Sequence, residues 1–240
     1  MSDALKASTI DAVVLCGGLG TRLQSVLKDT PKPMADFDNR PFLDLLIEYV
    51  GRFGFQRFIL CSGHKGNIIR DYFEKKNDGR TYIISQETSP LGTAGAIKYA
   101  EDQIKSDVFL GMNGDSFCDI DLTTFIDFHY SKQALASIAL VPLEDASDYG
   151  GVSLGAEDEI IHFDEKSDTP SSGWVNAGIY LFNKQLLESI PAGKVISLEK
   201  ELFPSIIGKG LYGFATQNQL LDIGTPERLE RARQLLIELN

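Results

Sequence analysis

Short apolar runs alternate with amphipathic stretches through the first half of the chain. Runs rich in β-branched residues predict buried strands, and apolar residues at helical spacing predict helices. The predicted strands are residues 10–16, 57–61, 81–85 and 107–116, and the predicted helices are residues 42–53, 65–76 and 91–104. Strands that alternate with helices are typical of a parallel sheet covered on both faces. The pattern therefore predicts an α/β fold of the Rossmann-like, three-layer α/β/α type.

The second half of the chain is less regular. Further strands are predicted at residues 137–143, 149–154, 159–166 and 173–182, and another strand ends within residues 220–225. Short helical patterns occupy residues 183–207, and residues 226–239 predict a helix with Pro226 in its first turn. No internal repeat, low-complexity tract or linker is evident. We therefore expect residues 1–240 to form a single domain around a mostly parallel mixed sheet.

Composition limits the class of protein. The 240 residues are 43% hydrophobic, which is enough to bury a substantial core. The net charge of −11 argues against nucleic acid and anionic membranes as partners, so an anionic ligand would need a locally built site. There is no run of about 18 apolar residues and no secretory signal at the N-terminus. The three cysteines are far apart in sequence, as suits a reducing compartment, and we expect a cytoplasmic protein.

A glycine-rich loop, LCGGLGTRLQSVLKDTPKPM, directly follows the first apolar run. Gly17, Gly18 and Gly20 would let backbone N–H groups approach an anion closely. Arg22 adds a multi-donor cation, and Lys32 lies between two prolines that restrict the loop. The P-loop pattern is absent, and the loop lacks the third glycine of the dinucleotide fingerprint. For the glycines alone, an ordinary turn is an equal alternative.

The run GGLGTRL followed by PKPM resembles the signature of the sugar-1-phosphate nucleotidyltransferases. Members of this family join a nucleoside triphosphate to a sugar 1-phosphate and release pyrophosphate, and the resemblance extends from about residue 10 to the final helix. It implies the family's nucleotide-diphospho-sugar transferase fold, without a C-terminal β-helix, and implies that Arg22 and Lys32 stabilise charge on the reacting phosphates. The implied nucleotide-binding residues are Leu15, Gly17, Gly18, Gly20, Thr21, Gln86, Gly92 and Thr93.

The stretch SQETSPLGTAGAI is similar to the family's base-recognition loop. By this resemblance Gln86 would reach the base edge, and Gly92 would let the base lie against the backbone. The variant PLGTAG resembles the loop of the guanylyltransferases, which implies GTP as the nucleotide. An ordinary Pro-Leu-Gly turn before a helix is the alternative reading of the same residues.

Two aspartates follow predicted strands. Asp115 in MNGDS comes after a buried strand, where ligands bind in open parallel sheets. The resemblance implies that Asp115 and Asp222, the latter in LLDIGTP, hold Mg²⁺. Two carboxylates with phosphate oxygens and water suit Mg²⁺, which rarely uses an all-protein cage. A helix-cap role is the alternative for each aspartate, although Thr225 fits the cap of the last helix better.

Three smaller motifs, YGGV, FDEKS and VNAGIY, resemble the family's sugar-binding segments in order and spacing. In FDEKS, Ser167 stands where many members have proline, so the resemblance does not extend to the shape of the local turn. The residues implied to bind the sugar phosphate are Asn113, Gly151, Glu165, Lys166, Asn176 and Gly178.

The resemblance implies D-glycero-α-D-manno-heptose 1-phosphate as the sugar substrate and GDP-heptose as the product, for surface polysaccharide synthesis. Mannose 1-phosphate with GTP and muramic acid 1-phosphate with UTP are the alternatives. A non-catalytic nucleotide-sugar-binding regulatory subunit is the alternative from another class. The presence of Arg22, Lys32, Asp115 and Asp222 favours an enzyme. A homodimer is the assembly that the family suggests.

Overall fold

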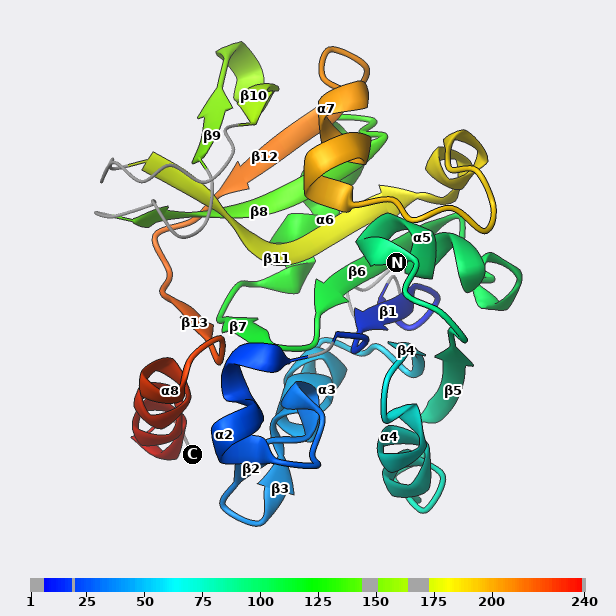
Figure 1. Ribbon diagram of the computed structural model, residues 1–240. Helices are drawn as coiled ribbons and strands as arrows, with labels where there is room; N and C mark the ends of the chain where they lie inside the picture. Colours follow the sequence, from blue (N-terminus) through cyan, green and yellow to red (C-terminus); the bar gives the residue numbers. More distant parts are fainter. Residues whose placement is uncertain (1–6, 19, 144–150, 164–172, 239–240) are drawn as a thin grey trace.

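A nine-stranded mixed sheet runs through the middle of the molecule (Figure 1). The computed structural model describes residues 7–18, 20–143, 151–163 and 173–238. Four parallel strands lie in the order β6-β1-β4-β5, and the antiparallel strand β11 joins them to β8, β9, β10 and β12. The strands of this sheet are β1 (Asp11–Leu15), β4 (Arg57–Ser62), β5 (Thr81–Gln86), β6 (Val108–Asn113), β8 (Ala136–Leu143), β9 (Gly151–Leu154), β10 (Ile160–Phe163), β11 (Gly173–Asn183) and β12 (Leu211–Ala215).

Helices cover both faces of this sheet. Alternate residues of a strand point to opposite faces, so Ala12 and Val14 pack in one core and Val13 packs in the other. The first core receives α3 (Phe42–Arg52), α4 (Gly66–Phe73), α6 (Leu122–Ser131) and α8 (Pro226–Glu238). The second core receives α5 (Gly92–Tyr99), η5 (Lys184–Ser189), η6 (Leu198–Leu202) and α7 (Phe203–Ser205). The predicted three-layer α/β/α fold is confirmed.

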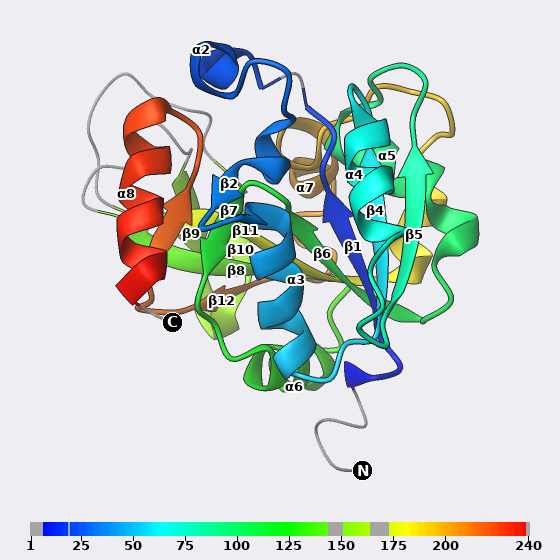
Figure 2. The ribbon, with the colours of Figure 1, turned by 90° about the horizontal axis from the view of Figure 1, so that it is seen from below.

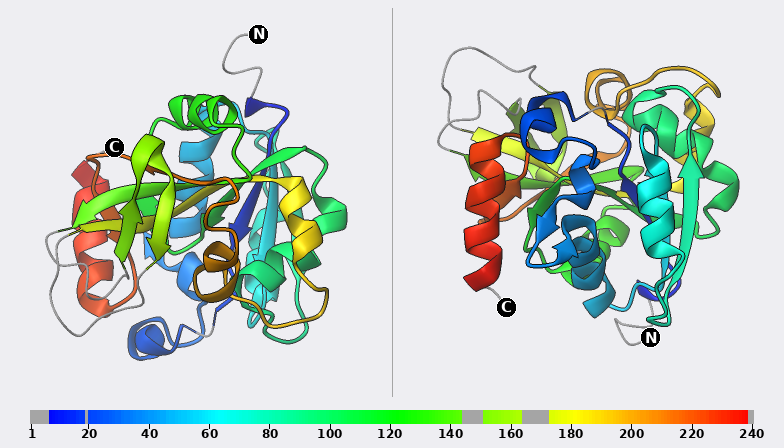
Figure 3. Two further views of the ribbon diagram at one scale, coloured as in Figure 1. Left: turned by 90° about the horizontal axis from the view of Figure 1, so that it is seen from above. Right: turned by 60° about the horizontal axis from the view of Figure 1, so that its bottom comes forward.

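A two-stranded sheet brings the end of the chain back to the carboxyl end of β6. In it β7 (Ser116–Cys118) pairs antiparallel with β13 (Leu220–Asp222), with Asp222 opposite Ser116. Helix α8 then runs beside the short strands β2 (Asp36–Phe37) and β3 (Arg40–Pro41), as Figures 2 and 3 show. Arg233 Nε donates to the Asp36 carbonyl at 3.1 Å. The final helix thus packs against the segment that contains Asp36.

Most predicted elements are present, with boundaries shifted by a few residues. The prediction omitted α6 and the strands β2, β3, β7 and β12. It also extended one strand over residues 107–116, where β6 ends at Asn113 and a turn leads to β7. Remaining short elements are η1 (Thr21–Leu23), α2 (Gln24–Leu27), η2 (Lys32–Met34), η3 (Glu101–Gln103) and η4 (Ala156–Asp158). None of the described helices is long and apolar enough to cross a membrane.

The three cysteines are buried and unpaired. Burial, together with a smaller effect of the neighbouring carboxylates Glu87 and Asp119, raises the pKa of the Cys61 and Cys118 thiols to about 12. Thiols with raised pKa values are poor nucleophiles and metal ligands, so these residues act as small core side chains.

Candidate active site

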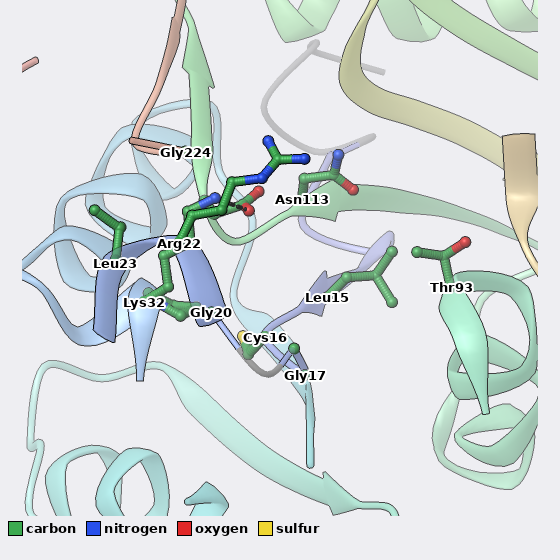
Figure 4. A pocket seen from close by; sticks show the side chains of 13 residues that line it. Leu15, Cys16, Gly17, Gly20, Arg22, Leu23, Lys32, Thr93, Asn113 and Gly224 are labelled. Carbon is green, nitrogen blue, oxygen red and sulfur yellow. Dashed lines mark hydrogen bonds and ion pairs between the residues drawn. The ribbon is translucent and has the colours of Figure 1, made fainter. Parts of the chain in front are cut away.

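A pocket of about 310 Å³ opens at the carboxyl ends of β1 and β6. These two strands are adjacent and parallel, with Leu15 beside Asn113. Ligands of open α/β sheets bind at this edge. The lining residues, shown in Figure 4, are Leu15, Cys16, Gly17, Gly18, Gly20, Arg22, Leu23, Lys32, Pro33, Thr93, Asn113, Asp115 and Gly224. The structure thus brings most of the predicted phosphate-binding residues to one cavity.

The glycine loop leaves its backbone accessible at the mouth of the pocket. Gly17 and Gly18 are exposed, and a Cβ atom on Gly18 would meet nothing within 4 Å. Gly20 has φ +55°, a conformation that favours glycine, and its carbonyl accepts from the Leu23 N–H at 3.0 Å. Thr21, also predicted to bind the nucleotide, begins η1 directly after this turn.

Two cationic side chains, from the turns η1 and η2 that follow the glycine loop, line the pocket. Arg22 is exposed, and no ion pair of its own is found among the described residues. Lys32 begins η2, a single turn closed by a bond from the Met34 N–H to the Pro31 carbonyl at 2.8 Å. Pro31 and Pro33 restrict that turn, as the sequence predicted. Lys32 Nζ lies 2.6 Å from Asp115 Oδ2 in a partly buried ion pair.

The two predicted metal ligands belong to neighbouring strand ends. Asp115 precedes β7 and Asp222 ends β13, and the Ile223 N–H donates to the Asp115 carbonyl at 3.1 Å. Asp222 accepts from the Gly224 N–H at 2.8 Å and forms an ion pair with Arg228 at 3.3 Å. Neither aspartate caps a helix.

Thr225 accepts from the Arg228 N–H at the start of α8, which confirms the preference for Thr225 as the cap.

The carboxylates of Asp115 and Asp222 suit a metal ion whose other ligands come from a bound phosphate and from water. Among the described residues no group of three or more His, Cys, Asp or Glu is arranged to hold a metal. Mg²⁺ binds through one or two carboxylates together with phosphate oxygens and water. Asp115 lines the pocket, and Asp222 accepts from the N–H of Gly224, which also lines it, so the chemistry of the two carboxylates fits such an ion.

The loop after β5 presents a carboxylate that the sequence interpretation did not select. Glu87 Oε1 lies beside the glycine loop, since a Cβ atom on Gly17 would be 3.4 Å from it, and Oε2 accepts from the Leu91 N–H at 3.1 Å. Burial raises the pKa of the Glu87 carboxyl, and the bond from Leu91 lowers it in part. The neighbouring Gln86 accepts instead from Arg70 of α4 at 2.7 Å.

The predicted sugar residues surround a break in β11. Asn176 accepts from the Gly178 N–H at 2.8 Å and donates to the Tyr180 hydroxyl at 2.9 Å. Gly178 has φ +75°, and a Cβ atom there would lie 2.7 Å from Asn113 Nδ2. The break therefore fits Asn113 against β11 at the floor of the pocket. Gly151 begins β9 opposite Val175.

Glu165 and Lys166 lie outside the described residues.

Comparison with known proteins gives the family. The family model described as nucleotidyl transferase matches residues 11–238. The chain therefore belongs to the nucleotidyl transferase family, which confirms the resemblance drawn from GGLGTRL and PKPM.

Two relatives and one solved structure are similar to nearly all of this chain. The chain is 35% identical to a D-glycero-α-D-manno-heptose 1-phosphate guanylyltransferase of Aneurinibacillus thermoaerophilus, over 95% of this chain and 98% of the relative. It is 33% identical to a mannose-1-phosphate guanylyltransferase of Mycobacterium tuberculosis, over 95% of this chain but only 65% of that relative. The crystal structure of HddC from Yersinia pseudotuberculosis complexed with GMP-PN superposes with a TM-score of 0.82, at 35% identity, over 95% of this chain and 99% of HddC.

Proposed function

We propose that this protein transfers GMP from GTP to D-glycero-α-D-manno-heptose 1-phosphate, giving GDP-heptose and pyrophosphate. The observation that carries the proposal is the convergence of Arg22, Lys32, Asp115 and the glycine loop on one pocket. The near full-length similarity to a heptose 1-phosphate guanylyltransferase supports the choice of both substrates. A precursor for surface polysaccharides is the product expected.

The chemistry requires positioning and charge neutralisation more than proton transfer. An oxygen of the sugar phosphate is already an anion at neutral pH, and it attacks the α-phosphorus of GTP. The bond from that phosphorus to the bridging oxygen breaks, and pyrophosphate leaves with the electron pair. Holding two polyanions in line is the main difficulty. Arg22 and Lys32 enter the pocket as cations that stabilise the developing charge.

We propose that Asp115 and Asp222 hold Mg²⁺ together with substrate phosphates. When bound, Mg²⁺ supplies positive charge to the phosphate oxygens without a proton transfer. Lys32, which donates to Asp115 in this structure, would then be available to donate to a phosphate oxygen. The exposed N–H groups of Gly17 and Gly18 are proposed to contact the phosphates of GTP.

We propose Glu87 as a reader of the base, in addition to the predicted Gln86. The Watson–Crick edge of guanine carries two adjacent N–H donors, which an ionised carboxylate can accept in parallel. Uracil and thymine present one N–H between two carbonyl oxygens, and those oxygens would be repelled by a carboxylate. The position of Glu87 beside Gly17 therefore favours guanine.

The sugar phosphate is proposed to lie over β11, with Asn113, Gly151, Glu165, Lys166, Asn176 and Gly178 as its contacts. Mannose 1-phosphate is the second candidate, because the chain is 33% identical to a mannose-1-phosphate guanylyltransferase over 95% of its length. Both sugars have the manno configuration, and they differ only in the length of the carbon chain attached to the ring, so one pocket can accept both.

A cytoplasmic site of action is proposed, since nucleoside triphosphates are available there.

The test is pyrophosphate release with Mg²⁺, the heptose 1-phosphate and each of GTP, ATP, UTP, CTP and dTTP in turn. Release with GTP alone is expected. Release with a different nucleotide would keep the class of reaction and contradict the base assignment. If a panel of sugar 1-phosphates also gave no release with any nucleotide, the protein would be a nucleotide-sugar-binding regulatory subunit.

A further inference from the structure

A segment from the second half of the chain lies against the turn that precedes α5. We call residues 91–95 the base turn and residues 194–199 the brace. The Ile196 N–H donates to the Leu91 carbonyl at 2.8 Å, and the Ile196 carbonyl accepts from the N–H groups of Ala94 at 3.0 Å and Gly95 at 3.2 Å. Two segments about 100 residues apart in sequence thus satisfy each other's backbone groups.

Two glycines of the base turn permit this close approach. A Cβ atom on Gly92 would lie 2.5 Å from the Ile196 carbonyl oxygen, and one on Gly95 would lie 2.6 Å from the Lys194 carbonyl oxygen. Gly92 also has φ +73°. The resemblance implies that Gly92 contacts the base of the nucleotide, and the structure adds a contact between Gly92 and the brace.

One side chain of the brace extends this contact to the pocket. The Thr93 hydroxyl donates to Glu199 Oε2 at 3.3 Å and accepts from the Leu198 N–H at 2.7 Å. The Ser197 hydroxyl also donates to Glu199 Oε2, at 2.9 Å. Thr93 lines the pocket on the side of α5, with its side chain facing Leu15 and Asn113 (Figure 4). The orientation of Thr93 is therefore set by Glu199 and the brace backbone.

The same carboxylate is close to the sugar half of the pocket. Burial raises the pKa of the Tyr180 hydroxyl, and the negative charge of Glu199 raises it further. Tyr180 is hydrogen-bonded by Asn176 and Asn113 beneath the pocket floor. Glu199 is therefore close enough for its charge to act on Tyr180, while its hydrogen bonds are made to Thr93 and Ser197.

We propose that Glu199 is a positioning residue that acts through Thr93 to hold the base turn in the shape that binds GTP. This inference rests on the proposed function, because it concerns the nucleotide of that reaction. A turn that is ordered before the nucleotide arrives does not have to be ordered by binding, and the affinity for GTP is higher as a result. Catalysis by Arg22 and Lys32 does not depend on this contact, and neither does binding at Gly151 on β9.

The expected result is a selective effect on GTP. Glu199→Ala removes the acceptor for the Thr93 and Ser197 hydroxyls. We expect the KM for GTP to rise about tenfold, because hydrogen bonds to a charged group are lost. The Kd of GTP, measured without sugar phosphate, should rise by the same factor. The KM for the sugar phosphate and the kcat should change less than about twofold. Glu199→Gln retains an accepting oxygen at the same place and should bind GTP nearly as wild type does.

Matched variants show whether the effect passes through Thr93. Thr93→Val should raise the Kd of GTP as Glu199→Ala does, whereas Thr93→Ser, which keeps the hydroxyl, should leave it unchanged. The double variant Thr93→Val, Glu199→Ala should bind GTP no more weakly than Thr93→Val alone. Glu201→Ala, an exposed glutamate on the same η6 turn, is the control and should bind GTP normally.

Three results would overturn the inference: an unchanged Kd of GTP in Glu199→Ala, an equal loss of sugar phosphate affinity or kcat, or a Glu199→Gln variant as weak as Glu199→Ala. If Glu199→Ala does not fold, the Thr93→Val and Thr93→Ser pair decides by the same criterion. Wild-type protein is measured first with GTP alone. Absence of binding there would contradict the proposed function itself, whereas normal wild-type binding with unaffected variants would contradict only the role of Glu199.

Discussion

Lys32 Nζ donates to Asp115 Oδ2 at 2.6 Å, so the cation expected to meet the substrate phosphates is paired with a carboxylate expected to hold Mg²⁺. The pair joins the PKPM turn to the end of β6, across 83 residues of sequence. Each partner neutralises the charge of the other. The free protein can in this way keep its two opposite charges close to the reacting position.

Arg22→Ala should lower kcat by about 10²–10³-fold, because deleting a preorganised donor to transition-state charge costs that much in other enzymes. Arg22 is exposed and lines the pocket, so the fold should not depend on it. Steady-state pyrophosphate release measures the effect. Arg52→Ala, an exposed arginine on α3, is the control and should leave kcat unchanged. Turnover near wild type in Arg22→Ala would remove this residue from the mechanism.

Asp115→Asn and Asp222→Asn should each abolish most of the Mg²⁺-dependent activity. An amide keeps the shape of the side chain but loses the charge that attracts Mg²⁺. Activity is measured over a series of Mg²⁺ concentrations, and partial recovery at high Mg²⁺ is expected. Asp29→Asn, a change at a fully exposed aspartate, should have no effect. Full activity at ordinary Mg²⁺ in either variant would exclude that aspartate from the metal site.

Glu87→Gln should reduce selectivity for GTP. The amide can no longer accept from two guanine donors at once, and a lost hydrogen bond to a charged group costs about 1.5–3 kcal/mol. We expect kcat/KM for GTP to fall by about 10–150-fold, with a smaller change for UTP. The neighbouring Thr88→Ala, at an exposed position of the same loop, is the control. Equal losses for GTP and UTP would contradict base reading by Glu87.

His129 should make stability depend on pH. This side chain is 2% exposed, bonds to the Ser137 hydroxyl at 2.9 Å, and has its pKa lowered by burial to about 4. The unfolded chain titrates near pH 6.5, so between about pH 6.5 and pH 4 it binds a proton that the folded state does not. The free energy of unfolding should therefore fall as the pH decreases, by about 1.4 kcal/mol per pH unit from this residue.

Urea unfolding at pH 7, 5.5 and 4.5 measures this contribution. The double variant His129→Leu, Ser137→Ala removes the titrating group and its partner together, and it should lose less stability than wild type over this range. His64→Gln, at an exposed histidine, should behave as wild type. Parallel pH profiles for wild type and the double variant would show that His129 does not titrate as its burial implies.

The layers of the fold could be predicted from the sequence, because most strands and helices of the first half show the hydrophobic period of their own type. Helix α6 was missed although its signal is local. Asp121 caps it by accepting from the Thr123 N–H at 2.8 Å, and Leu122, Phe125 and Ile126 are buried at helical spacing. Strand β7 has only three residues, and its pairing with β13 depends on a contact between distant parts of the chain.

Sequence motifs predicted which residues come together in the pocket, but not the contacts that depend on packing. Arg22, Lys32 and Asp115 come together as the motifs implied. Glu87 is one residue beyond Gln86, in the loop after β5, and the motif does not show which of the two side chains lies beside the glycine loop. The contact of Gly92 with Ile196 joins two halves of the chain, and no local pattern reports it.

The most direct test of the account is the fate of the α-phosphorus of GTP. The protein is incubated with Mg²⁺, the heptose 1-phosphate and GTP radiolabelled at that phosphorus, and the products are separated by chromatography and counted. The account predicts that the label appears in GDP-heptose, together with an equal amount of pyrophosphate, and only when the sugar phosphate and Mg²⁺ are both present. Label that stays in GTP with every sugar 1-phosphate, or passes only to GDP or GMP, would contradict nucleotidyl transfer by this protein.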